Sequence, residues 1–207
     1  MEQIENFIKD ITHELNTPIT ALKLTTSRAL KKGVYSPNTL KNISISTNQL
    51  YDIYTSLTYL NFKQEFNDIE VDLADILNES IEYYSQLASS KGIEIISNID
   101  SKRFIIDHVK AKLLFSNLIS NAIKYSYPNS KIEIELKNSI FKVLDYGIGI
   151  AADKQEFIFK RFHRESSYGG GFGIGLDIVK NICDEYGIKI EVKSKVECGS
   201  TFSLLFN

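Results

Sequence analysis

The stretch FIKDITHELNTPI, residues 7–19, decides how the first part of the chain folds. Its apolar residues recur three and four positions apart, which is the spacing of one face of an α-helix. His13 lies roughly 160° around this helix from the apolar stripe, so we expect its imidazole to face water. Glu14 follows as a candidate base, and Thr17 lies one turn further along the same surface. The stripe consists of Ile4, Ile8, Ile11, Leu15, Ile19 and Leu22.

This stretch alone does not assign a chemistry to the chain. The zinc pattern His-Glu-x-x-His of metalloproteases is excluded, because position 17 is threonine and not a second histidine. An ordinary solvated histidine is the leading interpretation of His13 until other segments are considered. The function therefore depends on what the rest of the chain supplies.

Two long helices are predicted in this part of the chain. The first covers about residues 2–32 and ends at Gly33, and Ser36 and Pro37 then provide an N-cap and a first helical residue. The second helix reaches about residue 63 with apolar residues in a heptad seam. Two antiparallel helices with so short a loop cannot cover both seams, so we expect a homodimer in which two copies form a four-helix bundle.

The remainder mixes helices and strands after a linker at residues 64–68. Because the elements do not alternate strictly, the pattern predicts a two-layer α/β sandwich. The fold class is thus α + α/β, with a helical hairpin domain at residues 1–66 and a sandwich domain at residues 67–207. The predicted helices are 73–91, 109–125 and 172–186, and the predicted strands are 93–99, 103–106, 131–136, 140–144, 188–192 and 201–206.

Composition narrows the class of partner. The 207 residues are 43% hydrophobic, enough for a sizeable core, and the net charge of −2 offers no general attraction to nucleic acid or to an anionic membrane. No run of about 18 apolar residues exists, so a soluble protein is predicted. Cys183 and Cys198 form no C-x-x-C pair, which indicates a reducing compartment and two buried thiols.

Two glycine-rich turns could approach phosphate closely with their backbone N–H groups. Residues 145–149, DYGIG, follow an apolar strand, and residues 169–175, GGGFGIG, open an amphipathic helix. The second is not a Walker P-loop, because no Lys-Ser/Thr follows it. The first matches a dinucleotide fingerprint only formally, since no complete strand–helix–strand unit follows. For either turn alone, an ordinary tight turn remains the leading alternative.

The helix between residues 109 and 125 carries a polar face that favours the phosphate-binding interpretation. Asn117, Asn121 and Lys124 fall at i, i+4 and i+7, so all three lie on one side of the helix. An asparagine carbonyl is a suitable hard oxygen ligand for Mg²⁺, which takes the rest of its shell from water and phosphates. The alternative is a merely solvated face.

Five segments together resemble, in order and spacing, the sequence boxes of sensor histidine kinases of two-component systems. The resemblance implies a dimerisation and phosphoacceptor domain followed by an ATP-binding domain of the kind shared with gyrase and Hsp90. It further implies ATP and Mg²⁺ as cofactors, autophosphorylation, transfer of the phosphoryl group to an aspartate of a response regulator receiver domain, and dephosphorylation of that regulator. The segments are residues 7–19, 117–125, 145–149, 157–164 and 171–176.

Carried over position by position, the resemblance implies a role for each matching residue. His13 is the expected phosphoacceptor, Glu14 its base, and Thr17 the group that orients a water for dephosphorylation. Arg164 is expected to reach the γ-phosphate. The expected nucleotide-binding residues are Asn121 as Mg²⁺ ligand, Asn117, Lys124 and Tyr125 around phosphates and ribose, Asp145 at the adenine amino group, and Gly147, Gly149, Gly171, Gly173, Gly175 and Leu176 along the lid.

The same resemblance implies that the chain is the cytoplasmic portion of an inner-membrane sensor, which meets the membrane only through segments absent from this sequence. Asn16 stands where a basic residue is usual, and Phe172 replaces a common Ser or Thr. One alternative is a hydrolysing ATPase of the gyrase and Hsp90 type, but such enzymes carry a Glu where this chain has Asn117. The other alternative is a dimeric scaffold that binds nucleotide without catalysis.

Overall fold

The computed structural model describes residues 2–33, 36–61, 66–159 and 174–207. The chain divides near residue 64 into a helical unit and an α/β unit. Within the described ranges, no helix is both long enough and apolar enough to cross a membrane.

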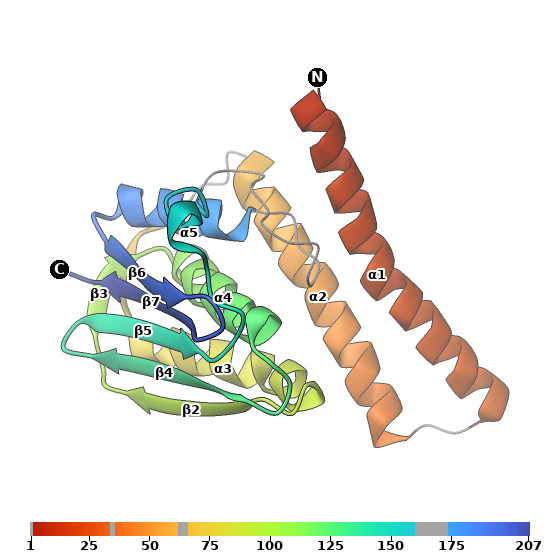
Figure 1. Cartoon of the computed structure of the whole chain (residues 1–207). Coiled ribbons are helices and arrows are strands. Elements are labelled where there is room, and N and C mark those ends of the chain that lie inside the picture. Colours follow the sequence, from red (N-terminus) through yellow and green to blue (C-terminus); the bar gives the residue numbers. More distant parts are fainter. Residues whose placement is uncertain (1, 34–35, 62–65, 160–173) are drawn as a thin grey trace. The chain divides into compact units, whose positions relative to one another are not determined.

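The helical unit is a hairpin of α1 (Glu2–Lys32) and α2 (Pro37–Asn61), which run antiparallel (Figure 1). Gly33 ends α1 with φ +60°, a conformation that glycine adopts without strain. The predicted cap of α2 is confirmed, since the Thr39 N–H donates to Ser36 Oγ at 3.2 Å. Apolar side chains stay exposed on both helices, including Leu30 at 71% and Leu40 at 59%. The hairpin therefore leaves apolar surface that its own two helices do not cover.

The α/β unit is built on a five-stranded sheet in the order β2-β4-β5-β7-β6. β2 pairs with β4 in parallel, and every other neighbouring pair in this sheet is antiparallel. This mixed sheet with helices confirms the predicted α/β layer arrangement. The strands are β2 (Glu94–Ile99), β4 (Lys131–Lys137), β5 (Ile140–Asp145), β6 (Lys189–Lys195) and β7 (Gly199–Leu205).

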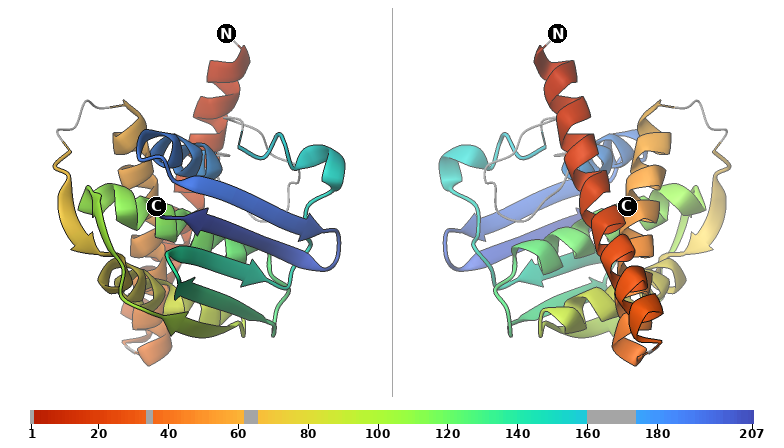
Figure 2. Two further views of the ribbon diagram at one scale, coloured as in Figure 1. Left: turned by 90° about the vertical axis from the view of Figure 1, so that its left-hand side faces the viewer. Right: turned by 90° about the vertical axis from the view of Figure 1, so that its right-hand side faces the viewer.

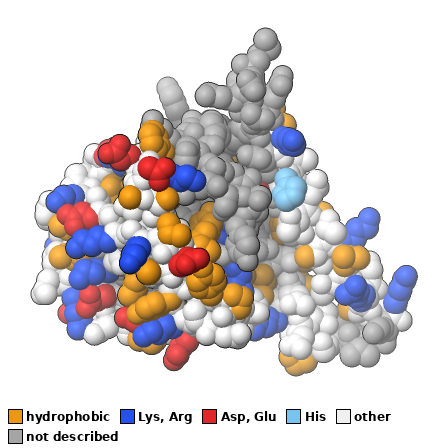
Figure 3. Space-filling view, viewed as in Figure 1, with side chains coloured by type: hydrophobic (Ala, Val, Ile, Leu, Met, Phe, Trp, Pro, Cys, Tyr) orange, Lys and Arg blue, Asp and Glu red, His pale blue; other side chains and the backbone are white. Residues whose placement is uncertain are grey.

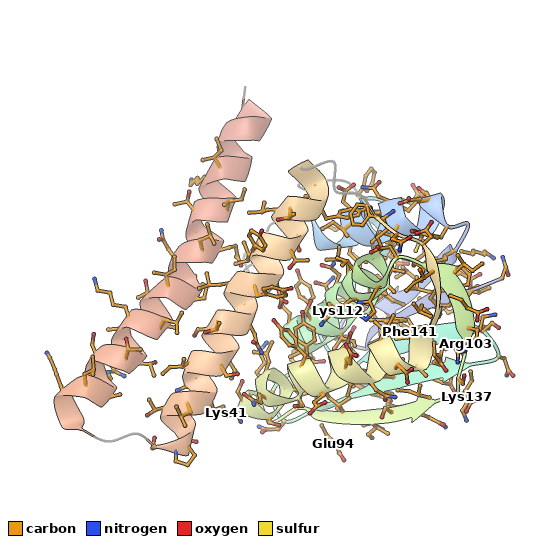
Figure 4. All side chains as sticks on the ribbon, turned by 180° about the vertical axis from the view of Figure 1, so that it is seen from behind. Lys41, Glu94, Arg103, Lys112, Lys137 and Phe141 are labelled. Carbon is orange, nitrogen blue, oxygen red and sulfur yellow. The ribbon has the colours of Figure 1, made fainter. Side chains whose placement is uncertain are left out.

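Three helices cover one face of this sheet (Figures 1 and 2): α3 (Leu73–Ser90), α4 (His108–Tyr125) and α5 (Gly175–Glu185). α4 lies between the other two and contacts both. Its Phe115 ring packs 5.0 Å from that of Phe141 on β5. Figure 4 shows Phe141 in the layer between helices and sheet, where it is fully buried. The central helix is thus fixed against the central strands by large apolar side chains.

Two short elements were not predicted from the sequence. β1 (Ile69–Asp72) pairs antiparallel with β3 (Arg103–Ile106) in a separate two-stranded sheet. A 3-10 turn, η1 (Ala152–Lys154), follows the first glycine turn. The expectation that both thiols are buried was wrong for Cys198, which is exposed because it lies in the turn between β6 and β7, whereas Cys183 on α5 is buried.

Polar contacts join the start of the α/β unit to the N-terminus of α4, and α4 to α5. Asp107 caps α4 by accepting from the N–H groups of Val109 and Lys110, and its second oxygen accepts from the Asn67 N–H at 2.9 Å. Lys110, almost fully buried, pairs with Glu185 of α5 at 2.6 Å. Burial alone lowers the pKa of Lys110, but its hydrogen bonds to Glu185 and Tyr186 raise this pKa above the ordinary value.

The surface of the α/β unit mixes both signs of charge. On the face seen in Figure 3, basic and acidic side chains are interspersed. On the sheet face away from the helices, Lys131 pairs with Glu133 at 2.7 Å, and Lys189 pairs with Glu191 at 2.7 Å. The described charges on these faces therefore do not gather into a patch of one sign.

Candidate functional site

The polar face of α4 forms one wall of the candidate site. The polar face points away from the sheet, because the opposite face of α4, which includes Leu114 and Leu118, is buried against the sheet. Asn117 and Asn121 lie one turn apart and are half-buried. The Asn117 amide nitrogen donates to the Leu113 carbonyl at 2.8 Å, so its carbonyl oxygen is directed away from the helix backbone. Lys124, a turn further on, has its ammonium 4.8 Å from the centre of the Tyr125 ring.

Gly175, the first residue of α5, packs against this wall. A Cβ atom at Gly175 would lie 2.5 Å from the Asn117 carbonyl oxygen, closer than van der Waals contact permits. A side chain at position 175 would therefore require the Asn117 side chain to shift from its present place. Leu176 and Asp177 follow in the first turn of α5, and both are half-buried.

Asp145 ends β5 and supplies the only buried carboxylate of the site among the described residues. It is 4% exposed. Burial raises the pKa of this carboxyl from an ordinary 3.8 to about 6, although hydrogen bonds from the Gly147 N–H and from the backbone and hydroxyl of Ser200 favour the ionised form. The Gly147 N–H donates at 3.0 Å. A carboxylate held in this way is a directed hydrogen-bond acceptor with little water around it.

The first glycine turn is joined directly to the end of α4. Gly147 forms a β-bridge with Ser126, and the Ile148 N–H donates to the Tyr125 carbonyl at 3.2 Å. A Cβ atom at Gly147 would lie 1.9 Å from that same carbonyl oxygen. Glycine is therefore required here for close approach of two backbones, which places Asp145 beside the polar end of α4.

The other side of the turn contacts the hairpin of β6 and β7. Gly149 has φ +64°, and a Cβ atom there would lie 2.0 Å from the Lys195 carbonyl oxygen. The Glu197 N–H donates to the Ile148 carbonyl at 2.8 Å. Segments from four separate parts of the α/β unit thus converge: the end of α4, the turn after β5, the start of α5 and the β6–β7 hairpin.

The sequence did not predict a role for three side chains in this region, which are Ser194, Ser200 and Gln155. Ser194 and Ser200 lie opposite each other on β6 and β7, and Ser200 also pairs with Asp145 across β5 and β7. Their hydroxyl oxygens are 2.9 Å apart. The signal in the sequence was indirect, since Ser200 follows a glycine, Gly199. In the structure that glycine begins β7, and a Cβ atom there would lie 1.9 Å from the Asp145 carbonyl oxygen.

The site fits a nucleotide and a hard cation. Ser126 Oγ is buried at the junction of α4 and the glycine turn and has no hydrogen-bond partner among the described residues, so this junction holds unused hydrogen-bonding capacity. No cluster of three His, Cys, Asp or Glu side chains that could hold a metal ion exists in the part of the chain that the structure describes. The side-chain oxygen of Asn121, which is half-buried on α4, is of the hard type that Mg²⁺ accepts as a ligand.

The remaining candidate residues fall into two groups. Arg164, Gly171 and Gly173 fall outside the described residues. His13, Glu14 and Thr17 belong to α1 in the helical unit, where His13 is exposed, as expected, and Glu14 is half-buried. The Thr17 hydroxyl donates to the His13 carbonyl at 3.1 Å, which keeps its oxygen lone pairs available.

Comparison with known proteins places these features in a family. Residues 106–207 match the family model "Histidine kinase-, DNA gyrase B-, and HSP90-like ATPase". The chain is 33% identical over 216 residues to the sensor-like histidine kinase SenX3 of Mycobacterium tuberculosis. The matching region covers 96% of this chain and 52% of that protein. It is 33% identical over 222 residues to the signal transduction histidine-protein kinase ArlS of Staphylococcus aureus, covering 99% of this chain and 49% of that protein.

A solved structure gives the same assignment. The chain is similar to the histidine kinase ThkA in its crystal structure with the response regulator protein TrrA, with 27% identity and a TM-score of 0.56 over 94% of this chain and 58% of that one. The chain spans about half the length of the curated relatives it matches. The chain belongs to the two-component sensor histidine kinase family and corresponds to the catalytic core of such a kinase.

Proposed function

We propose that the chain is an ATP-dependent protein-histidine kinase that phosphorylates itself on His13. The observation that carries the proposal is the convergence of Asn117, Asp145, Gly147 and Gly175 at one place in the α/β unit. In a chain of this family, that place is where ATP would bind. Residues 67–207 would then be the ATP-binding domain, and residues 1–66 the dimerisation and phosphoacceptor domain.

Each residue of the site has a chemical role in this proposal. The Asp145 carboxylate accepts a hydrogen bond from the adenine amino group, since an ionised carboxylate is an acceptor only. Asn121 offers its carbonyl oxygen to Mg²⁺, which offsets phosphate charge when bound. Arg164 would stabilise the charge that develops on the transferring phosphoryl group. Asn117, Lys124 and Tyr125 would surround phosphates and ribose. The glycines and leucine expected to border the nucleotide are Gly147, Gly149, Gly171, Gly173, Gly175 and Leu176.

His13 supplies the nucleophile. Its exposed imidazole nitrogen attacks the γ-phosphorus in line, a new N–P bond forms, and the P–O bond to ADP breaks. Glu14, the next residue, takes up the proton that the imidazole ring loses. The phosphoryl group on nitrogen is then transferred to an aspartate of a response regulator receiver domain. The crystal structure of the relative ThkA with TrrA supports a partner of this kind.

We also propose dimerisation through the helical hairpin. Ile8, Ile19, Leu24, Leu30 and Leu40 are exposed apolar side chains on α1 and α2. Burying one such side chain contributes about 1.5–3 kcal/mol, so a handful would stabilise a dimer substantially. A second copy would complete a four-helix bundle.

The cellular setting follows from the family in this proposal. The two relatives are named as sensor and signal transduction kinases and are about twice as long as this chain. We place the chain at the cytoplasmic side of an inner-membrane sensor. The competing function, ATP hydrolysis of the gyrase and Hsp90 type, is disfavoured because Asn117 cannot activate water as the glutamate of those enzymes does.

The proposal is tested by incubating the full chain with γ-labelled ATP and Mg²⁺. Protein-bound label should be lost in acid and kept in base, as for an N–P bond. His13→Gln should remove the label and leave nucleotide affinity unchanged. His108→Gln, at the exposed start of α4, is the matched control and should label normally. Label that persists on His13→Gln, or that is stable in acid, would contradict the assignment.

A further inference from the structure

A pair of serine hydroxyls connects the first glycine turn to Asp145. Ser194 Oγ accepts a hydrogen bond from the Ile150 N–H at 2.7 Å, and it lies 2.9 Å from Ser200 Oγ. Ser200 lies directly opposite Asp145 across β5 and β7, and its hydroxyl and backbone N–H lower the pKa of the Asp145 carboxyl against the effect of burial. The two serines face each other because positions 194 and 200 are directly paired across β6 and β7.

The direction of the hydrogen bonds between the serines and Asp145 follows from the charge on Asp145. Ionised Asp145 carries no proton, so the Ser200 hydroxyl is the donor between them, and Ser200 Oγ is left to accept. Ser194 has one proton, for which Ser200 Oγ and the Gly199 carbonyl, at 3.0 Å, compete. When Ser194 donates to Ser200, each hydroxyl polarises the next and strengthens the bond to the carboxylate.

The Ile150 peptide is held on both sides by the same small group of residues. Ser194 takes its N–H, while the Gln155 side-chain amide donates to its carbonyl at 3.2 Å and to the Ser194 carbonyl at 2.9 Å. Gly149, immediately before it, lies so close to β6 that a Cβ atom at this position would be 2.0 Å from the Lys195 carbonyl oxygen. The turn is therefore positioned from β6 by Ser194 and Gln155.

We propose that Ser194 is a positioning residue of the nucleotide site, holding the Ile150 peptide and orienting Asp145 through Ser200, so that the glycine turn and the base-binding carboxylate act as one unit. This inference rests on the proposed nucleotide site. In this proposal Ser194 acts through the Ile150 N–H and Ser200, and Gln155 acts with it by fixing the Ile150 carbonyl.

The test compares ADP binding by the full chain and its variants between about pH 5 and pH 8. Ser194→Ala should weaken ADP binding about 5- to 10-fold, the effect of one lost hydrogen bond, and Ser194→Thr, which keeps the hydroxyl, should restore it to within about twofold. Gln155→Met should weaken binding by a few-fold. Ser203→Ala is the matched control, since Ser203 lies on β7 opposite Glu191, on the face away from Ser194.

Two further readouts separate positioning from a general loss of stability. In Ser194→Ala the pH midpoint of ADP binding should move upward, because Asp145 loses support for its ionised form. The double variant with Ser200→Ala should have the midpoint of Ser200→Ala alone, since Ser194 acts through Ser200. Unchanged affinity and midpoint in Ser194→Ala, or additive shifts in the double variant, would overturn the inference. An unchanged chain that binds no ADP would overturn the nucleotide site, and the inference with it.

Discussion

Nucleotide affinity should depend on the ionisation of Asp145 in a pH range where ordinary aspartates do not titrate. Burial raises the pKa of Asp145 to about 6 from an ordinary 3.8. At pH 5 a carboxyl with a pKa of 6 is ionised in about one molecule in eleven, compared with more than about nine in ten for an unperturbed aspartate. In the proposed site the ionised form of Asp145 accepts the hydrogen bond from adenine, so affinity should be about tenfold lower at pH 5 than above pH 7.

The same shift has a consequence for stability. A carboxyl whose folded-state pKa is raised contributes stability while it is protonated, below its unfolded pKa of 3.8, and loses it as pH rises through about 6. The buried charge thus costs about 3 kcal/mol at neutral pH, at 1.36 kcal/mol for each unit of pKa. Asp145→Asn removes this cost, so at pH 7.5 it should raise the free energy of unfolding by about 1–3 kcal/mol while it weakens nucleotide binding.

Calorimetric titration with ATP from about pH 5 to pH 8, beside urea unfolding, measures both effects. Nucleotide phosphates also titrate in this range, so the quantity to follow is the ratio of affinities of the unchanged chain and Asp145→Asn. That ratio should rise about tenfold with pH. A ratio that stays flat, or an asparagine variant that is less stable at pH 7.5, would refute the reasoning.

Three further predictions address the metal, the assembly and the reverse reaction. Asn121→Ala should lose Mg²⁺-dependent ATP binding and labelling together, whereas the control Asn98→Ala on β2 should lose neither. Undiminished Mg-ATP affinity of Asn121→Ala in a titration would show that Asn121 is not a metal ligand. In light scattering the full chain should be a dimer and a fragment of residues 67–207 a monomer that still binds ATP; a monomeric full chain at micromolar concentration would exclude the bundle. Thr17→Ala should keep autophosphorylation within a few-fold and slow regulator dephosphorylation by about an order of magnitude or more, measured as phosphate release; equal release would exclude Thr17 from the mechanism.

Long periodic elements could be predicted well from the sequence. The apolar spacing of α1 and the stop at Gly33 give bounds that agree with the observed Glu2–Lys32. α4 was predicted to begin one residue late, at Val109 instead of His108. These predictions succeed because a helix is specified by local periodicity and by caps within a few residues.

Short elements with distant partners could not be predicted in this way. β1 has four residues, and its partner β3 begins 31 residues after its last residue, Asp72, so pairing and not local pattern makes it a strand. Exposure of Cys198 depends on the turn after β6. The glycine turns were found because glycine marks close backbone approach, but which backbone they approach was not visible.

The serines beside Asp145 show the same limit within the site. Ser194 and Ser200 are six positions apart on separate strands, and only the register of β6 and β7 brings their hydroxyls together. The raised pKa of Asp145 likewise depends on burial by the assembled layers. The charged and amide side chains of the site were recognisable by type, whereas the hydroxyls that position them were not.

The most direct test of the central claim is to locate the phosphoryl group. The full chain is incubated with ATP and Mg²⁺, digested at alkaline pH to protect an N–P bond, and mapped by mass spectrometry. We expect one phosphate on the peptide of residues 10–23, with fragment ions that place it on His13 and not on Thr12, Thr17 or Thr20. Phosphate on any of these threonines, on another peptide, or on no peptide while ATP is hydrolysed would contradict the assignment of His13.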